Sequence, residues 1–383
     1  MSIPLRVVFA MIVGTWLGAP LSLSLANEQP CGVPKPGIDD WKIEAQTAVS
    51  INPKLLCALI DNLETHKRNI HSVLVVRSGS LVFEHYRRGV DERWGTDLGE
   101  IAHGPEVKHD VRSVSKSVIS LLIGIALERK LIENIDQTIF SFLPQYASLR
   151  TPAKEHISLR HLLTMSSGIA WNEEIPYTDA RNSWLHMSDA PDPYRYVLEQ
   201  PQMAEPGKVW NYSGGSTALL AAVLQRTSGK WVEEFARDEL FAPLGITDFE
   251  WVKMPSSGEF AADSGLRLRP RDMAKLGQLV ISRGIWKGKP IVSAEWLKEA
   301  TVRRFRLDYN SYYGYQWWIS SSSVDGRKID WFEALGFGGQ RIVIVPSLEL
   351  VVVFTAGLYD AREGWLTTTR LLKDYVLPAA VGP

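Results

Sequence analysis

One stretch limits the fold of this chain more than any other. Residues 112–127 read RSVSKSVISLLIGIAL: small hydroxyl residues and one lysine come first, and an almost wholly apolar run follows. A helix that is apolar on every side belongs in the interior of a protein. The sequence therefore predicts a central buried helix whose first turn is polar.

That first turn has the composition of a catalytic pair. Ser113 and Lys116 are three residues apart, so on a helix their side chains share one face. Free backbone N–H groups and the positive end of the helix dipole there favour a negative oxygen. Burial of the lysine favours its neutral form, which could take a proton from the serine hydroxyl. The alternative is a chance match, because Ser-x-x-Lys is short; Ser115 and Ser117 lie nearby without a lysine three residues ahead.

The net charge of the chain and its N-terminal sequence limit its partners and its location. The 383 residues carry a net charge of −1 and contain no long basic cluster, so we expect no nucleic-acid partner. Apolar residues 7–17 followed by Ser24-Leu25-Ala26 predict a secretory signal cleaved after Ala26, giving a secreted or periplasmic protein that begins at Asn27. An uncleaved anchor or a buried helix is the alternative. No other stretch is long and apolar enough to span a bilayer.

Cysteine and histidine patterns give no metal signature. In an exported protein Cys31 and Cys57 could form a disulfide, or both could be free. There is no Cys-x-x-Cys and no His-Glu-x-x-His. We therefore expect neither a metal nor another cofactor.

Periodicity predicts an α/β (α+β) fold with a sheet built from both chain ends. An amphipathic helix over 53–66 and a hairpin of strands 72–77 and 80–86 come first, and 87–110 is polar and irregular. Residues 131–300 are mostly helical, with helices over 156–165, over 216–227 and from 270, and with a long aromatic loop over 171–193. Strands return over 312–319, 328–335, 341–345 and 350–355, and a helix over 367–376 follows them. The simplest assembly is one antiparallel sheet flanked by helices, with an inserted helical subdomain.

Two glycine-containing segments could complete a site. Tyr212, in the loop at 210–216, can relay protons if a nearby ammonium lowers its pKa; a tyrosine packed in a turn is the alternative. Ala334-Leu335-Gly336, at the end of a strand, could bring an N–H to a carbonyl oxygen, or could simply enter a hairpin turn. Gly-x-Ser-x-Gly is absent, although a triad through His161 remains arithmetically possible.

Taken together, the ordered motifs resemble the class C β-lactamase-like serine hydrolases. This group includes penicillin-binding proteins, family VIII esterases and 6-aminohexanoate-dimer hydrolases, and the last branch is the most similar. The resemblance spans about residues 70–380 and rests on four motifs: Ser113-Val-Ser-Lys116, Leu162-Leu-Thr-Met-Ser-Ser-Gly168, Tyr212-Ser-Gly214 and Gly336-Phe-Gly-Gly-Gln340.

The resemblance implies an acyl-enzyme on Ser113, with Lys116 and Tyr212 as the acid/base pair and a small ester or amide as substrate. We expect the Ser113 N–H to be one oxyanion donor and an N–H near Ala334, Leu335 and Gly336 to be the other, although the resemblance does not fix this second donor. Trp171 is expected to line the cleft, with core packing as the alternative. We expect a signal peptide over 1–26 and a single catalytic domain over 27–383, with its sheet part over about 50–112 and 310–383 and its helical part over about 113–309.

The chain also departs from the family pattern. Gly214 stands where class C β-lactamases have asparagine, and no Lys-Thr-Gly occurs near 331–338. Efficient β-lactamase action is therefore not expected, unless Arg341 or Arg267 supplies the missing cation. A D-alanyl-D-alanine peptidase or penicillin-binding protein, a β-lactamase, and a non-catalytic binding descendant remain the alternatives.

Overall fold

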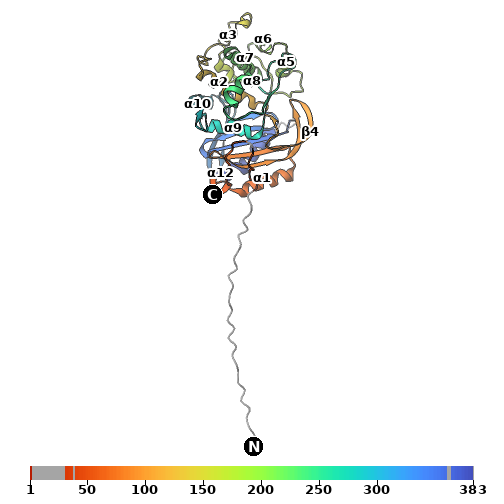
Figure 1. Cartoon of the computed structure of the whole chain (residues 1–383). Coiled ribbons are helices and arrows are strands. Elements are labelled where there is room, and N and C mark those ends of the chain that lie inside the picture. Colours follow the sequence, from red (N-terminus) through yellow and green to blue (C-terminus); the bar gives the residue numbers. More distant parts are fainter. Residues whose placement is uncertain (2–30, 38, 360–363, 383) are drawn as a thin grey trace.

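An eight-stranded antiparallel sheet forms the centre of the molecule (Figure 1). The computed structural model describes every residue except 2–30, 38, 360–363 and 383. In spatial order the strands are β10 (Phe305–Arg306), β11 (Ser311–Tyr313), β12 (Trp318–Val324), β13 (Arg327–Gly336), β14 (Gln340–Val345), β15 (Leu350–Ala356), β1 (Ile70–Arg77) and β2 (Ser80–Tyr86). Because β1 pairs with β15, the predicted sheet from both chain ends is confirmed.

The sheet is buried on both faces, which explains its continuous apolar strands. Along β1, Val73 and Val75 belong to one apolar cluster, whereas Leu74 and Val76 belong to the other. This is the two-residue alternation of a pleated strand with a hydrophobic layer on each side.

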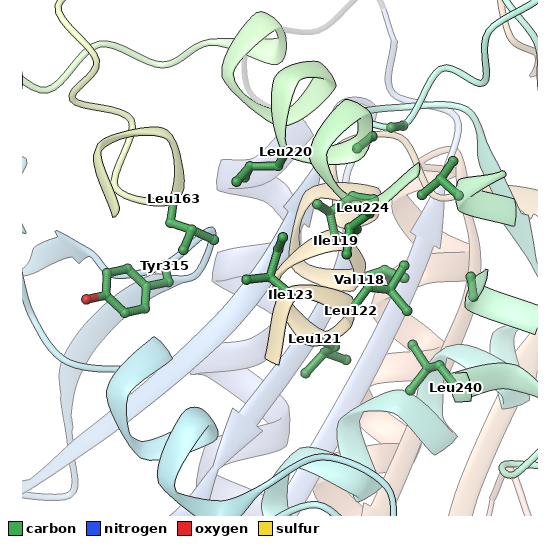
Figure 2. Packing of buried hydrophobic residues seen from close by; sticks show 14 of the residues in the cluster. Val118, Ile119, Leu121, Leu122, Ile123, Leu163, Leu220, Leu224, Leu240 and Tyr315 are labelled. Carbon is green, nitrogen blue, oxygen red and sulfur yellow. The ribbon is translucent and has the colours of Figure 1, made fainter. Parts of the chain in front are cut away.

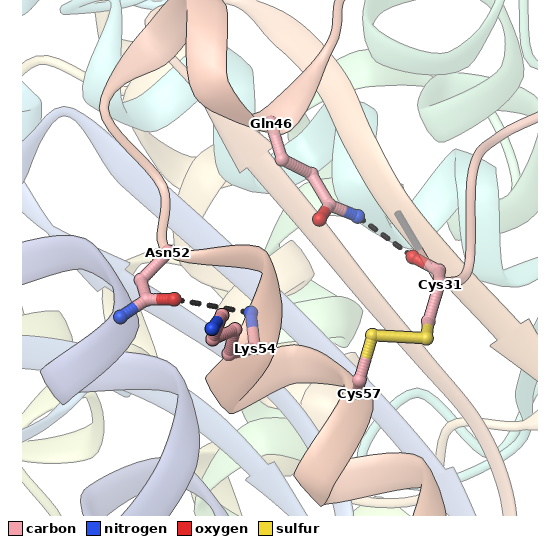
Figure 3. The surroundings of a disulfide bond; sticks show 5 residues. All are labelled: Cys31, Gln46, Asn52, Lys54 and Cys57. Atoms are coloured by element: carbon pink, nitrogen blue, oxygen red, sulfur yellow. Dashed lines mark hydrogen bonds between the residues drawn. A yellow bond between two sulfur atoms is a disulfide. The ribbon is translucent and has the colours of Figure 1, made fainter. Parts of the chain in front are cut away.

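Helices near the two chain ends cover one face (Figure 1). These are α1 (Pro53–His66), α11 (Gly364–Leu371), η5 (Leu372–Val376) and α12 (Leu377–Val381). The Asn52 side chain caps α1 by accepting the Lys54 N–H, and a disulfide joins Cys31 to Cys57 on this helix (Figure 3). Of the two states left open for the cysteines, the structure has the disulfide. The short η1 (Gln46–Val49) adds a hydrogen bond of 2.8 Å from Gln46 Nε2 to the Cys31 carbonyl.

The helical part covers the other face, with α2 at its centre (Figures 1 and 2). Every residue of α2 (Val114–Glu128) from Val114 to Ala126 is buried, as its sequence predicts. Of the other helices, α7 (Gly214–Ser228), η3 (Arg237–Phe241) and α10 (Ala294–Ala300) contact α2. The remaining ones are α3 (Ile139–Phe142), η2 (Pro144–Leu149), α4 (Leu159–Leu163), α5 (Ser183–Asp189), α6 (Pro193–Glu199), α8 (Val232–Ala236) and α9 (Pro270–Ile281). Figure 2 labels Ile119 and Ile123 of α2 with Leu163 of α4 and Leu220 of α7, and all four belong to one apolar cluster.

The prediction of an irregular segment over 87–110 is wrong. It contains the hairpin β3 (Arg88–Arg93) and β4 (Thr96–Ala102), followed by β5 (His109–Asp110). The hairpin is largely exposed and its residues are mostly polar, so its sequence shows no alternation of apolar and polar residues. Its turn is made by Trp94 and Gly95, both with positive φ. β5 joins β7 (Leu266–Leu268) and β6 (Glu250–Trp251) in a small sheet. The remaining short elements are β8 (Ile285–Trp286), β9 (Lys289–Pro290) and η4 (Pro346–Leu348).

Three further boundaries differ from prediction. The strand expected over 312–319 is interrupted, because Gly314 to Gln316 leave the sheet between β11 and β12 and Gln316 has a φ of 64°. The helix expected over 156–165 is reduced to α4, and the long loop over 171–193 contains α5. These short helices lie in irregular connections, where apolar periodicity is too brief to mark them.

Two predictions concern membranes and export. Among the described residues, no helix is both long and apolar enough to cross a bilayer. The signal-peptide prediction for residues 1–26 lies, apart from Met1, outside the described residues, as does the expected start at Asn27.

Candidate active site

Ser113 and Lys116 meet at the start of α2. Ser113 is the N-cap residue and half-buried, and Arg112 before it has a φ of 50°. Lys116, only 2% exposed, points back along the helix, and its Nζ donates a hydrogen bond of 3.0 Å to Ser113 Oγ. A reachable hydroxyl thus lies in direct contact with a buried amine.

The surroundings of Lys116 are acidic. Its Nζ lies 3.1 Å from the Asp263 carbonyl oxygen, 3.5 Å from Asp263 Oδ2 and 4.0 Å from Glu173 Oε1. Burial acts to lower the pKa of Lys116, but the interaction with the Tyr212 hydroxyl and the negative charges of Asp263 and Glu173 outweigh it and raise that pKa above its ordinary value. Burial does favour the neutral amine, as expected from the sequence, but acidic partners from distant segments reverse the net direction of the pKa shift.

The Glu173 carboxylate is fixed by three donors. Glu173 Oε2 accepts hydrogen bonds of 2.6 Å from both Trp171 Nε1 and the Gly214 N–H, and Glu173 Oε1 accepts one of 3.1 Å from the Tyr177 hydroxyl. Burial raises the pKa of Glu173, opposed by the positive charge of Lys116. These contacts hold the carboxylate with its Oε1 4.0 Å from Lys116 Nζ.

Asp263 forms the second acidic neighbour. Its Oδ2 accepts a hydrogen bond of 2.8 Å from Trp184 Nε1, and the residue is 1% exposed. Sequence reasoning missed both acids. The available signals were an acidic residue two positions after Trp171 and a single acidic residue among the small residues that precede β7.

Tyr212 also lies against Lys116. Its ring centroid is 4.9 Å from Lys116 Nζ, and the next residue, Ser213, caps α7 by accepting the Ser216 N–H. Burial raises the pKa of the Tyr212 hydroxyl, while the charge of Lys116 and hydrogen bonds with Ser113 and Lys116 act to lower it. The structure therefore brings the three main candidates, Ser113, Lys116 and Tyr212, into one contact group.

The end of β13 borders this group. A Cβ added to Gly336 would lie only 2.3 Å from the Val111 carbonyl oxygen, so the strand touches the segment that leads into Ser113. Ala334 is fully buried, and Leu335 is half-buried. Beyond them, the exposed Phe337 ring lies 5.3 Å from that of Tyr177.

Other residues singled out in the sequence have structural contacts. Trp171 is 8% exposed, belongs to the main apolar cluster and orients Glu173. The Nδ1 of His161 accepts the Ser158 N–H at the start of α4. The hydroxyls of Ser115 and Ser117 donate to the backbone carbonyls of Arg112 and Gln316.

The two arginines considered as substitute cations are both occupied. Arg341 is 1% exposed and donates a hydrogen bond of 2.8 Å from Nε to Glu333. Arg267 is 7% exposed and forms an ion pair with Asp110. Each guanidinium is buried against its own carboxylate.

Comparison with known proteins gives one consistent family. The Beta-lactamase family model matches residues 58–364. A 6-aminohexanoate-dimer hydrolase from Paenarthrobacter ureafaciens is 22% identical over 299 residues, covering 73% of this chain and 70% of that protein. The solved structure of a proposed 6-aminohexanoate-dimer hydrolase from Bacillus anthracis is similar with a TM-score of 0.70 at 20% identity, over 91% of this chain and 88% of that one. EstCE1, a hydrolase with promiscuous acyltransferase activity, gives 0.67 at 16% identity, over 85% and 98%.

Proposed function

The chain belongs to the β-lactamase family, and from this premise we propose that it is a serine hydrolase that cleaves an ester or amide bond of a small substrate through an acyl-enzyme on Ser113. The observation that carries the proposal is the 3.0 Å hydrogen bond from buried Lys116 to Ser113 Oγ. Hydrolase activity among the relatives agrees with it.

In the proposed reaction Ser113 Oγ attacks the substrate carbonyl carbon. The hydroxyl proton passes to the Lys116–Tyr212 pair, and the same pair returns a proton to the leaving alcohol or amine. Water then attacks the acyl-enzyme, releases the acid and restores the Ser113 hydroxyl. The developing oxyanion accepts hydrogen bonds from the Ser113 N–H and from an N–H of the Ala334 to Gly336 segment.

The charges near Lys116 decide which protonation state can react. With Asp263 and Glu173 ionised, the pair of Lys116 and Tyr212 keeps both of its protons at neutral pH, because the carboxylates stabilise the ammonium. One proton must leave this pair before it can accept the proton of Ser113. We therefore expect activity to rise toward alkaline pH.

The same charges favour substrates without a carboxylate. Two acidic groups against one ammonium leave the site with a net negative charge, and Arg341 and Arg267 are occupied elsewhere. A penicillin carboxylate therefore finds no free cation among these groups. Neutral esters and amides do not need one.

An exported protein with a single catalytic domain over 27–383 also belongs to the proposal. The disulfide between Cys31 and Cys57 supports an oxidising compartment, where such bonds persist. Mass spectrometry of the secreted or periplasmic protein is expected to find Asn27 at its N-terminus. An intact Met1 terminus would contradict export with cleavage.

Covalent labelling tests the nucleophile. Wild-type protein should react with a labelled fluorophosphonate, and Ser113→Ala should abolish both the label and ester hydrolysis. Ser120→Ala is the matched control, because Ser120 lies in the same helix, is fully buried, and its hydroxyl forms no hydrogen bond within the described residues. A label that persists in Ser113→Ala and maps to another serine would end the assignment.

A second probe separates the alternatives. A penicillin-binding protein or β-lactamase would also be acylated by labelled penicillin, whereas the proposed esterase or amidase reacts with fluorophosphonate alone. A binding descendant without catalysis would react with neither probe. Only the fluorophosphonate pattern agrees with the proposal.

A further inference from the structure

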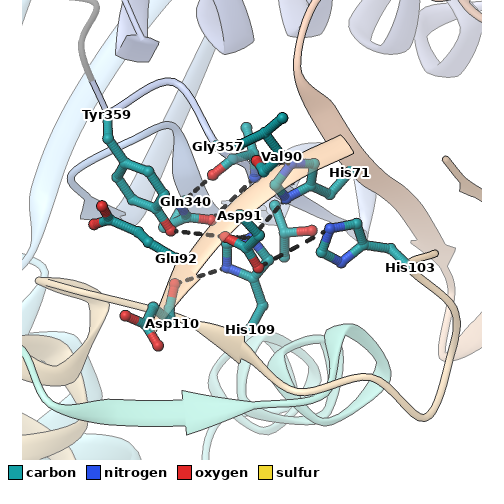
Figure 4. Close-up of polar contacts among 12 residues, drawn as sticks. His71, Val90, Asp91, Glu92, His103, His109, Asp110, Gln340, Gly357 and Tyr359 are labelled. Atoms are coloured by element: carbon teal, nitrogen blue, oxygen red, sulfur yellow. Dashed lines mark hydrogen bonds and ion pairs between the residues drawn. The ribbon is translucent and has the colours of Figure 1, made fainter. Parts of the chain in front are cut away.

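Figure 4 shows a buried group of histidines and one aspartate, one of which, His109, begins the short strand β5 that precedes Ser113 in the chain. His71 is on β1, Asp91 on β3 and His109 on β5, and all three are at most 3% exposed. One ligand atom from each lies within 4.8 Å of the others. None of them belongs to the proposed catalytic group.

The hydrogen bonds of His71 fix where its proton lies. The Asn69 side-chain nitrogen donates to the Val90 and Gly357 carbonyls, which turns Asn69 Oδ1 toward the histidine. His71 Nε2 thus faces two acceptors, Asn69 Oδ1 at 3.0 Å and the Val90 carbonyl oxygen at 3.1 Å. It must carry a hydrogen, so the neutral ring has a bare lone pair on Nδ1.

The same reasoning applies to His109. Its Nδ1 lies 2.9 Å from the Asp110 carbonyl oxygen, so Nδ1 carries the hydrogen and Nε2 is bare. The two bare nitrogens, His71 Nδ1 and His109 Nε2, face each other at 2.8 Å. Asp91 Oδ1, a third acceptor, is 3.4 Å from His109 Nε2.

Three converging lone pairs need a positive charge between them, which is either a shared proton or a metal ion. The convergence of His71 Nδ1, His109 Nε2 and Asp91 Oδ1, all buried and within 4.8 Å of one another, is the arrangement that a metal ion requires. In protein metal sites the other nitrogen of a ligating imidazole commonly donates to a carbonyl oxygen, which fixes the tautomer and the ring orientation. His71 and His109 both have such a carbonyl oxygen.

We propose that His71 Nδ1, His109 Nε2 and Asp91 Oδ1 bind a divalent transition metal, with zinc as the preferred ion. Two imidazole nitrogens and a carboxylate oxygen form a ligand set that suits Zn²⁺. The site joins β1, β3 and β5, and β5 runs directly into Arg112 and Ser113.

His103 closes the site from one side. Its ring stacks on that of His71 with centroids 3.9 Å apart, and its Nε2 lies 4.0 Å from the second Asp91 oxygen. This nitrogen is buried and makes no hydrogen bond within the described part of the chain. Tyr359 donates its hydroxyl to Asp91 Oδ1 from another direction. We assign both residues to the surroundings of the metal, not to its ligands.

Metal content of the mature protein, purified without a polyhistidine tag, tests the proposal. After dialysis against metal-free buffer we expect about one zinc per chain by elemental analysis, and visible absorption typical of low-symmetry Co²⁺ after cobalt exchange. Asp91→Asn and His109→Gln should lose the zinc. His156→Gln should keep it, because the side chain of His156 is 76% exposed and lies outside the cluster.

Thermal unfolding of the wild-type protein gives a second test, which does not depend on whether a variant folds. Adding Zn²⁺ at about a hundredfold excess over its Kd should raise the Tm of chelator-treated protein by about 5 °C, reversibly. No retained metal together with an unchanged Tm would overturn the proposal and leave a shared proton between the two histidines. Equal zinc loss in His156→Gln and Asp91→Asn would show adventitious binding and would overturn it as well.

Discussion

Replacing Asp263 by asparagine should move the pH profile of hydrolysis toward acid. Asp263 Oδ2 lies 3.5 Å from Lys116 Nζ, and both groups are buried. The carboxylate raises the pKa of Lys116, so it delays the loss of the proton that the reaction requires. Without this charge the reactive form should appear at lower pH.

The size of the effect follows from Coulomb's law. Two unit charges 3.5 Å apart in an effective dielectric of about 20 interact by about 5 kcal/mol. The asparagine oxygen would still stabilise the ammonium, and Glu173 and the Asp263 carbonyl remain in place, so only part of this energy is lost. Since 1.36 kcal/mol corresponds to one pH unit, we expect the ascending limb to move down by about one to two units.

The assay is kcat/KM for p-nitrophenyl butyrate against pH, which reports the free enzyme. Hydrolysis measured with Ser113→Ala supplies the background at alkaline pH. Asp248→Asn is the control, because Asp248 also pairs with a lysine but lies at the surface. An ascending limb that stays in place or moves to higher pH in Asp263→Asn would refute the proposed charge balance.

Two further predictions concern stability and substrates. Cys57→Ser removes the bond to Cys31, which closes a loop with a sequence separation of 26, and should lower the free energy of unfolding by about 3.5 kcal/mol in the chain-entropy model. Urea unfolding with and without reductant checks this, and a wild-type protein indifferent to reductant would contradict it. Nitrocefin should be hydrolysed about 30- to 2,000-fold less efficiently than p-nitrophenyl butyrate, since one charge-assisted hydrogen bond to its carboxylate and one neutral hydrogen bond to its amide are missing. A kcat/KM for nitrocefin at or above that for the ester would show that a cation such as Arg341 reaches the substrate after all.

Patterns along the sequence predicted the parts of the structure that depend on local periodicity. The α1 helix has its predicted bounds because Asn52 and Pro53 mark its start and its leucines share one face. The buried α2 helix and the late strands of the sheet follow from their apolar runs for the same reason. The β3–β4 hairpin was missed because it lies on the surface and its turn begins with Trp94, which does not mark a hairpin turn.

Chemical groups brought together from distant segments were predicted less well. The Ser113–Lys116 contact is local, one helical turn, and the sequence indicated it directly. Glu173 lies 57 positions further along the chain than Lys116, and Asp263 lies 147 positions further. The ligands of the proposed metal site do not form a motif of short, fixed spacing either, because each comes from a different strand. Such contacts depend on tertiary packing, which cannot be predicted from the spacing of residues within one segment.

The glycine at position 214 explains how Glu173 and Asp263 can both lie close to Lys116. A Cβ at this position would lie 2.8 Å from Asp263 Oδ2 and 3.0 Å from Glu173 Oε2, and the Gly214 N–H already donates to Glu173. An asparagine side chain therefore has no room while both carboxylates keep their places. In the sequence, Gly214 differs from the asparagine of class C β-lactamases by lacking an amide that could bind the substrate. In the structure, the absence of a side chain at Gly214 leaves room for Glu173 and Asp263 to approach Lys116. The site therefore has two negative charges near the proposed nucleophile where an asparagine would have placed a neutral amide.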